Sequence, residues 1–220
     1  MNEKKLAGER AAELVQDGMV VGLGTGSTVH YTIVKLASMV QEGLSITGIP
    51  TSKQTEVLAL EHGIPLASLG EEKTIDLTID GADELDGQLT LIKGGGGALL
   101  REKMIAYHSK QMVVVADSNK LVRQLGAFPL PVEVVPFGYQ TTMAALSKLG
   151  CKATLRMNGD ESFITDNQNL IVDCSFESIP SPPKLHEWLN AIPGVVENGL
   201  FIGLAEKAYI GRDGGVTIIE

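Results

Sequence analysis

The sequence predicts an α/β protein with a Rossmann-like, mostly parallel sheet and a smaller ferredoxin-like α+β domain. Between residues 1 and 127, short apolar runs alternate with segments of helical period, and the connections between them are short. The chain of 220 residues contains 25 glycines, which is typical of tight loops between such elements. Beyond residue 128 the order of the expected elements changes, which indicates the second domain.

An amphipathic helix is expected first, over residues 3–16, because apolar residues recur there at helical spacing. The apolar run Met19–Leu23 is bounded by glycine and predicts a buried strand. The same alternation continues along this part of the chain. The further expected strands are 45–49, 74–79, 89–92 and 112–116, and the further expected helices are 29–40, 53–62 and 98–108.

The pattern changes at Phe128-Pro-Leu-Pro131, where two closely spaced prolines indicate a boundary. The elements beyond it follow the β-α-β-β-α-β order of a ferredoxin-like unit. They are strand 132–135, helix 139–149, strands 152–157 and 169–174, helix 182–191 and strand 194–198. Apolar runs at 208–210 and 216–219 are expected to return to the first sheet. We therefore expect an α/β domain of residues 1–127 and 199–220, and a ferredoxin-like domain of residues 128–198.

The charge balance of the chain limits its partners. Lys and Arg number 18 against 27 Asp and Glu, a net charge of −9, which argues against a nucleic-acid binder. A few lysines and backbone amides can still hold one phosphate. No apolar run approaches the ~18 residues of a membrane span, and Met1–Lys5 do not begin a signal peptide. We expect a cytoplasmic protein with neither a nucleic-acid nor a membrane partner.

The residues that most often hold metals are sparse and scattered. Cys151 and Cys174 are the only cysteines and are expected to be reduced thiols in or near a core. Trp188 lies at helical spacing with two leucines and is expected in the core. The histidines have no spacing typical of metal ligands, so no metal site is expected; they are His30, His62, His108 and His186.

A glycine-rich loop, Gly22–Thr28, follows the first expected strand. Ser27 stands where the dinucleotide fingerprint needs its third glycine, and no acidic residue follows the second strand. The loop also lacks the lysine of a P-loop, so both nucleotide motifs fail. It is either a phosphate cradle made of backbone N–H groups and hydroxyls, or a simple strand-to-helix turn. Its candidate ligands are Thr25, Gly26, Ser27 and Thr28.

The segment Asp80–Asp86 places four carboxylates in seven residues where the third main strand ends. Ligands of open α/β sheets gather at the carboxyl ends of strands. An EF-hand calcium loop would need an oxygen ligand at Ala82 and a glutamate at Lys93, so that pattern fails. Carboxylates that bind sugar hydroxyls and a solvated acidic turn both remain open.

Four consecutive glycines, in Lys93–Gly97, cost chain entropy that an ordinary loop does not need, which favours a backbone lying against a ligand. Glu102 stands on the following helix, where it is either a site residue or a surface residue paired with a nearby lysine. Lys120 closes the segment Ala116–Lys120 just past a strand end, where it either meets a phosphate or is an ordinary surface lysine.

These segments together resemble the type A family of ribose-5-phosphate isomerases over essentially the whole chain. The matching segments, in this order and spacing, are Gly22–Thr28, Thr51–Thr55, Asp80–Asp86, Lys93–Lys103 and Ala116–Lys120. The resemblance implies interconversion of ribose 5-phosphate and ribulose 5-phosphate in the pentose phosphate pathway, with no metal or organic cofactor. It also implies a homodimer, with tetramers in some members.

The resemblance assigns roles to matching positions. Glu102 matches the catalytic base, and Asp80, Asp83 and Lys93 match polar residues of the active site. The implied substrate-binding residues are Thr25, Gly26, Ser27, Thr28, Asp80, Gly81, Ala82, Asp83, Lys93, Gly94, Gly95, Gly96, Lys120 and, from a looser match, Lys4.

The chemistry of these residue types fits the implied reaction. A single carboxylate can take a proton from C2 of the sugar and return it to C1. Lys93 and the glycine backbone can stabilise the enediolate oxygen. Two other classes stay open: a non-catalytic sugar-phosphate sensor, and an acyl- or CoA-transferring enzyme on a related fold. A sensor that regulates transcription would normally add a helix-turn-helix, for which residues 1–20 are too short.

Overall fold

A computed structural model describes residues 2–71 and 74–220 of the chain. It contains two compact units. The first unit comprises Met1–Ala82, Arg101–Leu121 and Gly203–Glu220, and the second comprises Asp83–Leu100 and Val122–Ile202. The expected α/β class with a largely parallel sheet is confirmed. The domain boundaries that the sequence predicts, residues 1–127 with 199–220 and residues 128–198, remain a proposal.

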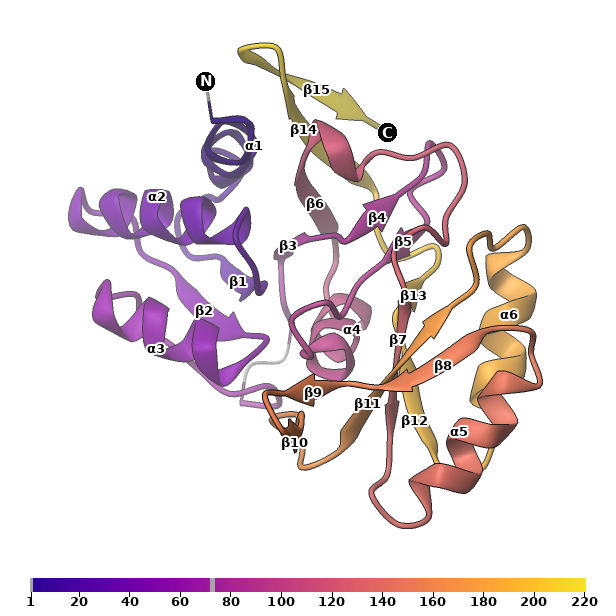
Figure 1. Cartoon of the computed structure of the whole chain (residues 1–220). Coiled ribbons are helices and arrows are strands. Elements are labelled where there is room, and N and C mark those ends of the chain that lie inside the picture. Colours follow the sequence, from indigo (N-terminus) through magenta and orange to yellow (C-terminus); the bar gives the residue numbers. More distant parts are fainter. Residues whose placement is uncertain (1, 72–73) are drawn as a thin grey trace. The chain divides into compact units, whose positions relative to one another are not determined.

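A six-stranded sheet forms the centre of the first unit, in the order β15-β14-β6-β3-β1-β2 (Figure 1). All neighbours in it are parallel except the last pair of the chain, β14 and β15. The C-terminal apolar runs therefore return to the first sheet, as expected. The strands are β1 (Val20–Leu23), β2 (Thr47–Pro50), β3 (Leu77–Gly81), β6 (Met112–Asp117), β14 (Lys207–Arg212) and β15 (Gly215–Ile219).

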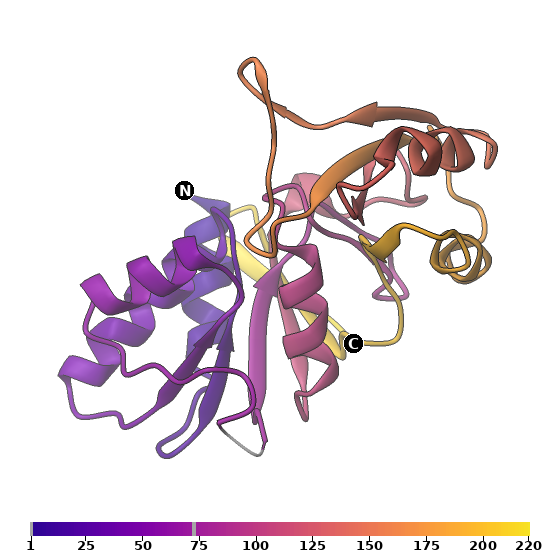
Figure 2. The same cartoon turned by 90° about the horizontal axis from the view of Figure 1, so that it is seen from below.

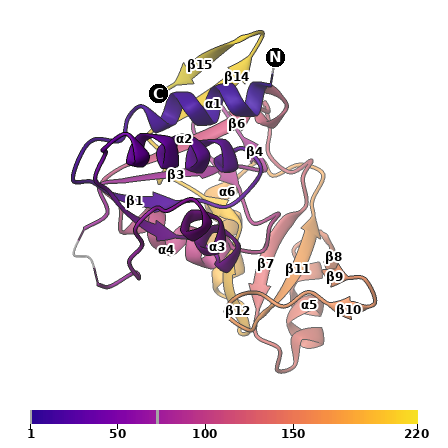
Figure 3. The same cartoon turned by 90° about the vertical axis from the view of Figure 1, so that its left-hand side faces the viewer.

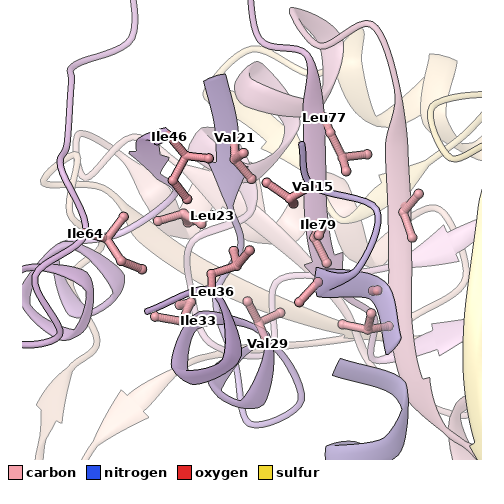
Figure 4. Close-up of a cluster of buried hydrophobic side chains, with 14 of the residues drawn as sticks. Val15, Val21, Leu23, Val29, Ile33, Leu36, Ile46, Ile64, Leu77 and Ile79 are labelled. Atoms are coloured by element: carbon pink, nitrogen blue, oxygen red, sulfur yellow. The ribbon is translucent and has the colours of Figure 1, made fainter. Parts of the chain in front are cut away.

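Helices cover both faces of this sheet, which explains why its strands are apolar runs rather than alternating ones. The helices are α1 (Glu3–Ala12), α2 (Val29–Gln41), α3 (Lys53–Glu61) and α4 (Leu99–Tyr107). In Figures 2 and 3, α1, α2 and α3 lie on one face of the sheet and α4 lies on the other. Val21 and Leu23 of β1 join the large cluster under the first three helices, whereas Val20 packs with Ile105 of the fourth. Figure 4 shows part of the large cluster.

The helix expected over residues 3–16 ends at Ala12. Asn2 caps its start by accepting a hydrogen bond from the backbone N–H of Lys5. Beyond Ala12 the chain tightens, since the N–H groups of Leu14 and Val15 donate to carbonyl groups three residues back. Apolar spacing predicted the buried face correctly but not the change of hydrogen-bond pattern.

The second unit contains a four-stranded antiparallel sheet in the order β12-β7-β11-β8. Helices α5 (Tyr139–Ser147) and α6 (Pro182–Asn190) bury leucines against one face of it (Figure 1). This order of elements and strands is the ferredoxin-like arrangement that the sequence predicts. The strands are β7 (Leu130–Val134), β8 (Lys152–Leu155), β11 (Leu170–Ser175) and β12 (Val195–Asn198).

Of the very short strands of the second unit, β5 (Leu91–Ile92) corresponds to the strand expected over residues 89–92, but it pairs in a small separate sheet. The other very short strands were not expected. A hairpin of β9 (Met157–Asn158) and β10 (Glu161–Ser162) extends between β8 and β11. A three-stranded sheet joins β4 (Glu84–Leu85), β5 (Leu91–Ile92) and β13 (Leu200–Phe201). Two-residue strands carry too few side chains to show a period in the sequence.

Trp188 corrects one expectation, because its side chain is 48% exposed rather than in the core. Leu185 and Leu189, one turn apart, occupy the buried face of α6, and Trp188 lies on the flank of that face. The ammonium of Lys184 lies 4.8 Å from the centre of its ring. Both cysteines are buried thiols, as expected. In the parts of the chain that are described, no helix is long and apolar enough to cross a membrane.

Candidate active site

The carboxyl ends of four parallel strands of the first unit carry the predicted polar segments. The loop Gly24–Thr28 follows β1, Thr51 follows β2, Asp80 lies within the end of β3, and Asp117–Lys120 ends β6. Strands β1 and β3 are neighbours although β2 lies between them in the sequence. The strand order therefore reverses here, and ligands of open α/β sheets bind at such a reversal.

Asp80 is fully buried at this reversal. Its Oδ1 accepts hydrogen bonds from the backbone N–H of Thr25, at 3.1 Å, and of Gly81, at 2.7 Å. The chain passes close to it at Gly24, where a Cβ would lie 2.2 Å from the same oxygen. The glycine is required because only a residue without a side chain lets the loop approach the carboxylate this closely.

Hydroxyl groups near the start of α3 hold the glycine loop. The Thr25 hydroxyl lies 2.7 Å from that of Thr51, 2.8 Å from that of Ser52 and 3.0 Å from that of Thr55. Thr55 also donates to the carbonyl of Gly24 at 2.9 Å, and Ser52 caps α3. No site role was predicted for Thr51, Ser52 or Thr55, although they lie in a segment that resembles the family.

The N-terminal end of α2 and the start of α1 meet at the same loop. Thr28 precedes α2 and its side chain makes no capping hydrogen bond. The N–H groups of His30 and Tyr31 donate to the carbonyls of Gly26 and Thr28, so it is the positive end of the helix dipole that favours an anion here. Lys4 donates to the Ser27 hydroxyl at 2.9 Å and lies 4.0 Å from Asp117. The structure thus brings Lys4 to the loop, in agreement with its looser family match.

Lys120 lies at the end of a short 3-10 helix, η1 (Ser118–Lys120), which contacts β6 and β14. Asp117 accepts from the backbone N–H of Asn119 and so caps this helix. The side chain of Glu3 accepts from both the N–H and the hydroxyl of Ser118, at 3.0 and 2.7 Å. These two hydrogen bonds lower the pKa of Glu3 and tie α1 to η1.

Glu102 lies in the first turn of α4 and is 4% exposed, so it is not a surface residue. A carboxylate in the first turn of a helix is stabilised by the helix dipole. A buried carboxyl group that ionises is the kind of side chain that serves as a catalytic base.

In the second unit, Asp83 and the glycine loop Lys93–Gly97 meet directly. Oδ2 of Asp83 accepts from the N–H of Gly95 at 2.7 Å, and a Cβ at Gly95 would lie 2.5 Å from the other carboxylate oxygen. Lys93 is 2% exposed, and its ammonium lies 5.5 Å from the centre of the Phe201 ring. Gly94 and Gly97 have φ angles of 100° and 79°, which favour glycine.

The acidic segment is not a solvated turn. Glu84 is 4% exposed and accepts from the N–H groups of Gly126 and Phe128, at 2.7 and 2.6 Å. Asp86 accepts from those of Gln88 and Thr90, both at 2.9 Å. These two carboxylates hold the backbone of the second unit, which leaves Asp80 and Asp83 as the site candidates of the segment.

Hydrogen bonds join several of the predicted residues into three groups. Thr25 and Gly81 meet Asp80, Lys4 meets Ser27, and Asp83 meets Gly95. The remaining predicted residues belong to the same segments: Gly26, Thr28, Ala82, Lys93, Gly94, Gly96, Glu102 and Lys120. Among residues 2–71 and 74–220, no group of three or more His, Cys, Asp or Glu side chains is placed to hold a metal ion.

A parallel sheet that presents a Gly-Ser-Thr loop, a helix N-terminus and a buried carboxylate at one edge is typical of proteins that bind small phosphorylated ligands. The family model described as ribose 5-phosphate isomerase A (phosphoriboisomerase A) matches residues 47–215. The chain belongs to this family, and it is an isomerase.

Relatives named ribose-5-phosphate isomerase A match nearly the full chain. That of Bacillus mycoides is 56% identical over 98% of both chains, and that of Parvibaculum lavamentivorans is 51% identical over 100% of this chain and 98% of its own. A solved D-ribose-5-phosphate isomerase in complex with phospho-erythronic acid matches all of both chains with a TM-score of 0.96 and 43% identity. The enzyme of Methanocaldococcus jannaschii matches 99% of this chain and 97% of its own, with a TM-score of 0.94 and 42% identity.

Proposed function

We propose that this isomerase interconverts D-ribose 5-phosphate and D-ribulose 5-phosphate through an enediolate, with Glu102 as the proton-transferring base. The reaction belongs to the non-oxidative pentose phosphate pathway. The observation that carries the proposal is the burial of Glu102, a carboxylate 4% exposed in the first turn of α4 of a member of this isomerase family.

The proposed chemistry balances with one base. Glu102 takes the proton from C2 of the open-chain aldose, and the electron pair of that bond forms the C1–C2 double bond while negative charge gathers on O1. A proton moves from O2 to O1, and Glu102 returns the first proton to C1, which leaves the ketone at C2. Asp80 or Asp83 assists ring opening and the movement of the proton between the two oxygens.

Negative charge on the enediolate needs donors that are already in place. The ammonium of Lys93 and the N–H of Gly96 have this role in the proposal. The N–H groups of Lys93 and Gly95 already donate to the Gly199 carbonyl and to Asp83. Lys93 is held in a buried position, and Gly95 and Gly96 are exposed. Donors fixed before the reaction cost no reorganisation when the charge develops.

The phosphate of the substrate anchors the end remote from the reacting carbons. Its proposed ligands are the loop Thr25–Thr28, the N-terminus of α2, Lys120 and Lys4. Support comes from the Lys4–Ser27 contact of 2.9 Å and from the place of the loop at the N-terminus of α2, the positive end of the helix dipole. Binding energy from the phosphate positions C1 and C2 against the base.

The variant E102Q tests the assignment of the base. Its amide has nearly the same shape but cannot accept the C2 proton, so we expect a loss of kcat of about 1000-fold or more, with binding of phospho-erythronic acid nearly unchanged. E61Q is the control, because Glu61 lies at the exposed end of α3. Full activity of E102Q would refute the assignment.

A sugar-phosphate sensor is the second candidate function. It is favoured only if the wild-type protein binds ribose 5-phosphate and forms no product. Catalysis is the first candidate because the match to ribose-5-phosphate isomerase A of Bacillus mycoides covers 98% of the chain, which has both the loop Thr25–Thr28 and the buried Glu102.

We also propose that the chain acts in the cytoplasm as a homodimer. Size-exclusion chromatography with light scattering should give twice the mass of one chain. A mass of one chain at micromolar concentration would contradict the dimer, and four times the mass would indicate a tetramer.

A further inference from the structure

Arg156 holds the glycine loop of the second unit from behind. This residue follows β8, and its Nη1 donates to the carbonyl oxygens of Gly94 and Gly95, at 2.9 and 3.0 Å. Its Nε and Nη2 donate to the two carboxylate oxygens of Asp173, at 2.9 and 2.5 Å. One guanidinium therefore joins two successive peptide groups of the loop to a carboxylate of β11.

The sheet makes this clamp rigid. Asp173 pairs with Thr154 in the register of β11 and β8, and the N–H of Arg156 donates to the carbonyl of Ile171 at 2.8 Å. The Arg156 and Asp173 side chains are 14% and 25% exposed, so solvent weakens their ion pair less than that of an exposed pair. The bidentate geometry fixes the plane of the guanidinium.

Phe163, next to the β9–β10 hairpin, supports the other end of the loop. The guanidinium carbon of Arg156 lies 5.8 Å from the centre of its ring. A Cβ at Gly97 would lie 2.4 Å from ring atoms of Phe163, so the loop passes directly against this ring. The hairpin that the sequence did not predict thus has a definite contact with a predicted substrate-binding segment.

The geometry of the peptide bond converts this clamp into an orientation of N–H groups. In a trans peptide the C=O of one residue and the N–H of the next point in opposite directions. The Gly94 carbonyl points at Arg156, so the Gly95 N–H points away from it, and there it donates to Asp83 at 2.7 Å. The Gly95 carbonyl also points at Arg156, so the Gly96 N–H points away from Arg156 as well.

We propose that Arg156, supported by Asp173, is a positioning residue that keeps the Gly95 N–H on Asp83 and aims the Gly96 N–H at the developing oxyanion of the sugar. Successive N–H groups held on one side of a turn form a concavity that binds anions. A cation on each carbonyl oxygen also polarises the peptide and strengthens the N–H on its other side. This inference rests on the proposed function, since the oxyanion is that of the proposed reaction.

Four variants test the inference. R156M removes the guanidinium and all its hydrogen bonds, whereas R156K keeps a positive charge without the planar guanidinium. D173N removes the ion pair but leaves the Arg156 donors to the Gly94 and Gly95 carbonyls. R10M is the matched control, because Arg10 pairs with the exposed Glu13 on the surface of α1. Each is measured for kcat and KM with ribose 5-phosphate and for the exchange rates of the Gly95 and Gly96 amide hydrogens.

We expect the kcat of R156M to be about 10- to 100-fold below that of the wild type, because misplaced donors no longer stabilise the transition state. The change in KM should be much smaller. Exchange of the Gly95 amide should rise about tenfold, the equivalent of one net hydrogen bond. The kcat and the Gly95 exchange rate of R156K should be closer to those of R156M than to those of the wild type. The reason is that one ammonium cannot span both carbonyls and both carboxylate oxygens. The kcat and the Gly95 exchange rate of D173N should lie between those of R156K and the wild type.

The inference is overturned if folded R156M has a kcat within twofold of that of R10M, or if the exchange rate of its Gly95 amide is unchanged. If R156M does not fold, the same two criteria apply to R156K. A wild-type protein without isomerase activity would instead refute the proposed function. In that case the amide exchange of Gly95 in R156K still decides whether Arg156 orients the loop.

Discussion

The neighbouring carboxylates of Asp80, Asp83 and Glu84 differ in role because different backbone N–H groups donate to them. Asp80 accepts from Thr25 and Gly81, and Asp83 from Gly95, which are loop residues of the proposed site. Glu84 accepts from Gly126 and Phe128 and so holds backbone away from those loops. Burial and the identity of the donors, rather than residue type, separate a candidate site group from a structural one.

At the residue scale, G24A tests the approach of the loop to Asp80. The added methyl would lie 2.2 Å from a carboxylate oxygen and 2.6 Å from the Cα of Asp80, so the loop must move. We expect a loss of about 1–3 kcal/mol in the free energy of unfolding and a fall in kcat/KM.

The control for this prediction is G87A. No heavy atom lies within 4 Å of a Cβ built at Gly87, and its φ is not in the left-handed region. G87A should therefore unfold in urea with a midpoint equal to that of the wild type or slightly above it. Equal midpoints for G24A and the wild type would show that the close approach to Asp80 does not constrain the loop.

At the element scale, the link between α1 and η1 joins the two short segments that carry Lys4 and Lys120. It consists of the Glu3 carboxylate and the Ser118 N–H and hydroxyl. A charged acceptor makes these hydrogen bonds stronger than neutral ones. The position of both proposed phosphate-binding lysines therefore depends on one glutamate.

The variant E3Q tests this link through its pH dependence. The Ser118 hydrogen bonds hold the pKa of Glu3 below its ordinary value of 4.5 in the folded protein. The stability it contributes is present above that ordinary value and is lost as pH falls through the lowered pKa. We expect the Tm of E3Q to lie below that of the wild type at pH 7, and the gap to close as the pH falls below 4.

E9Q serves as the control on the same helix, since Glu9 pairs only loosely with exposed Lys5, at 3.8 Å. Its Tm should follow that of the wild type at every pH. A gap between E3Q and the wild type that stays constant from pH 7 to pH 3 would contradict the role given to the carboxylate charge.

Across the whole molecule, the sequence predicted what depends on local pattern. Alternating apolar runs and helical periods were enough to predict the parallel sheet. The ferredoxin-like arrangement could be predicted from the order of its elements, which are β7, α5, β8, β11, α6 and β12. The glycine loops could be selected because glycine clusters at strand ends are typical of ligand-binding loops. Spacing left Glu102 open between a site residue and a surface residue, and only the resemblance to the family assigned it a role.

What the sequence did not predict depends on contacts between distant residues. Arg156 lies 62 residues from Gly94 and carries no local sign of its role. Thr51 and Ser52 look like ordinary turn residues until the strand order places them against Thr25. Helical spacing alone did not separate the flank of α6, which holds Trp188, from its buried face.

The fate of the C2 proton in heavy water tests most directly whether Glu102 is the base. The wild-type protein, treated with EDTA, is mixed with ribose 5-phosphate in D₂O and followed by NMR. With Glu102 as the base, ribulose 5-phosphate should carry solvent deuterium at C1, complete or partial, because one carboxylate carries the proton and exchanges it with solvent. Product with no deuterium at all, formed only when metal is restored, would indicate a hydride shift and contradict Glu102 as the base.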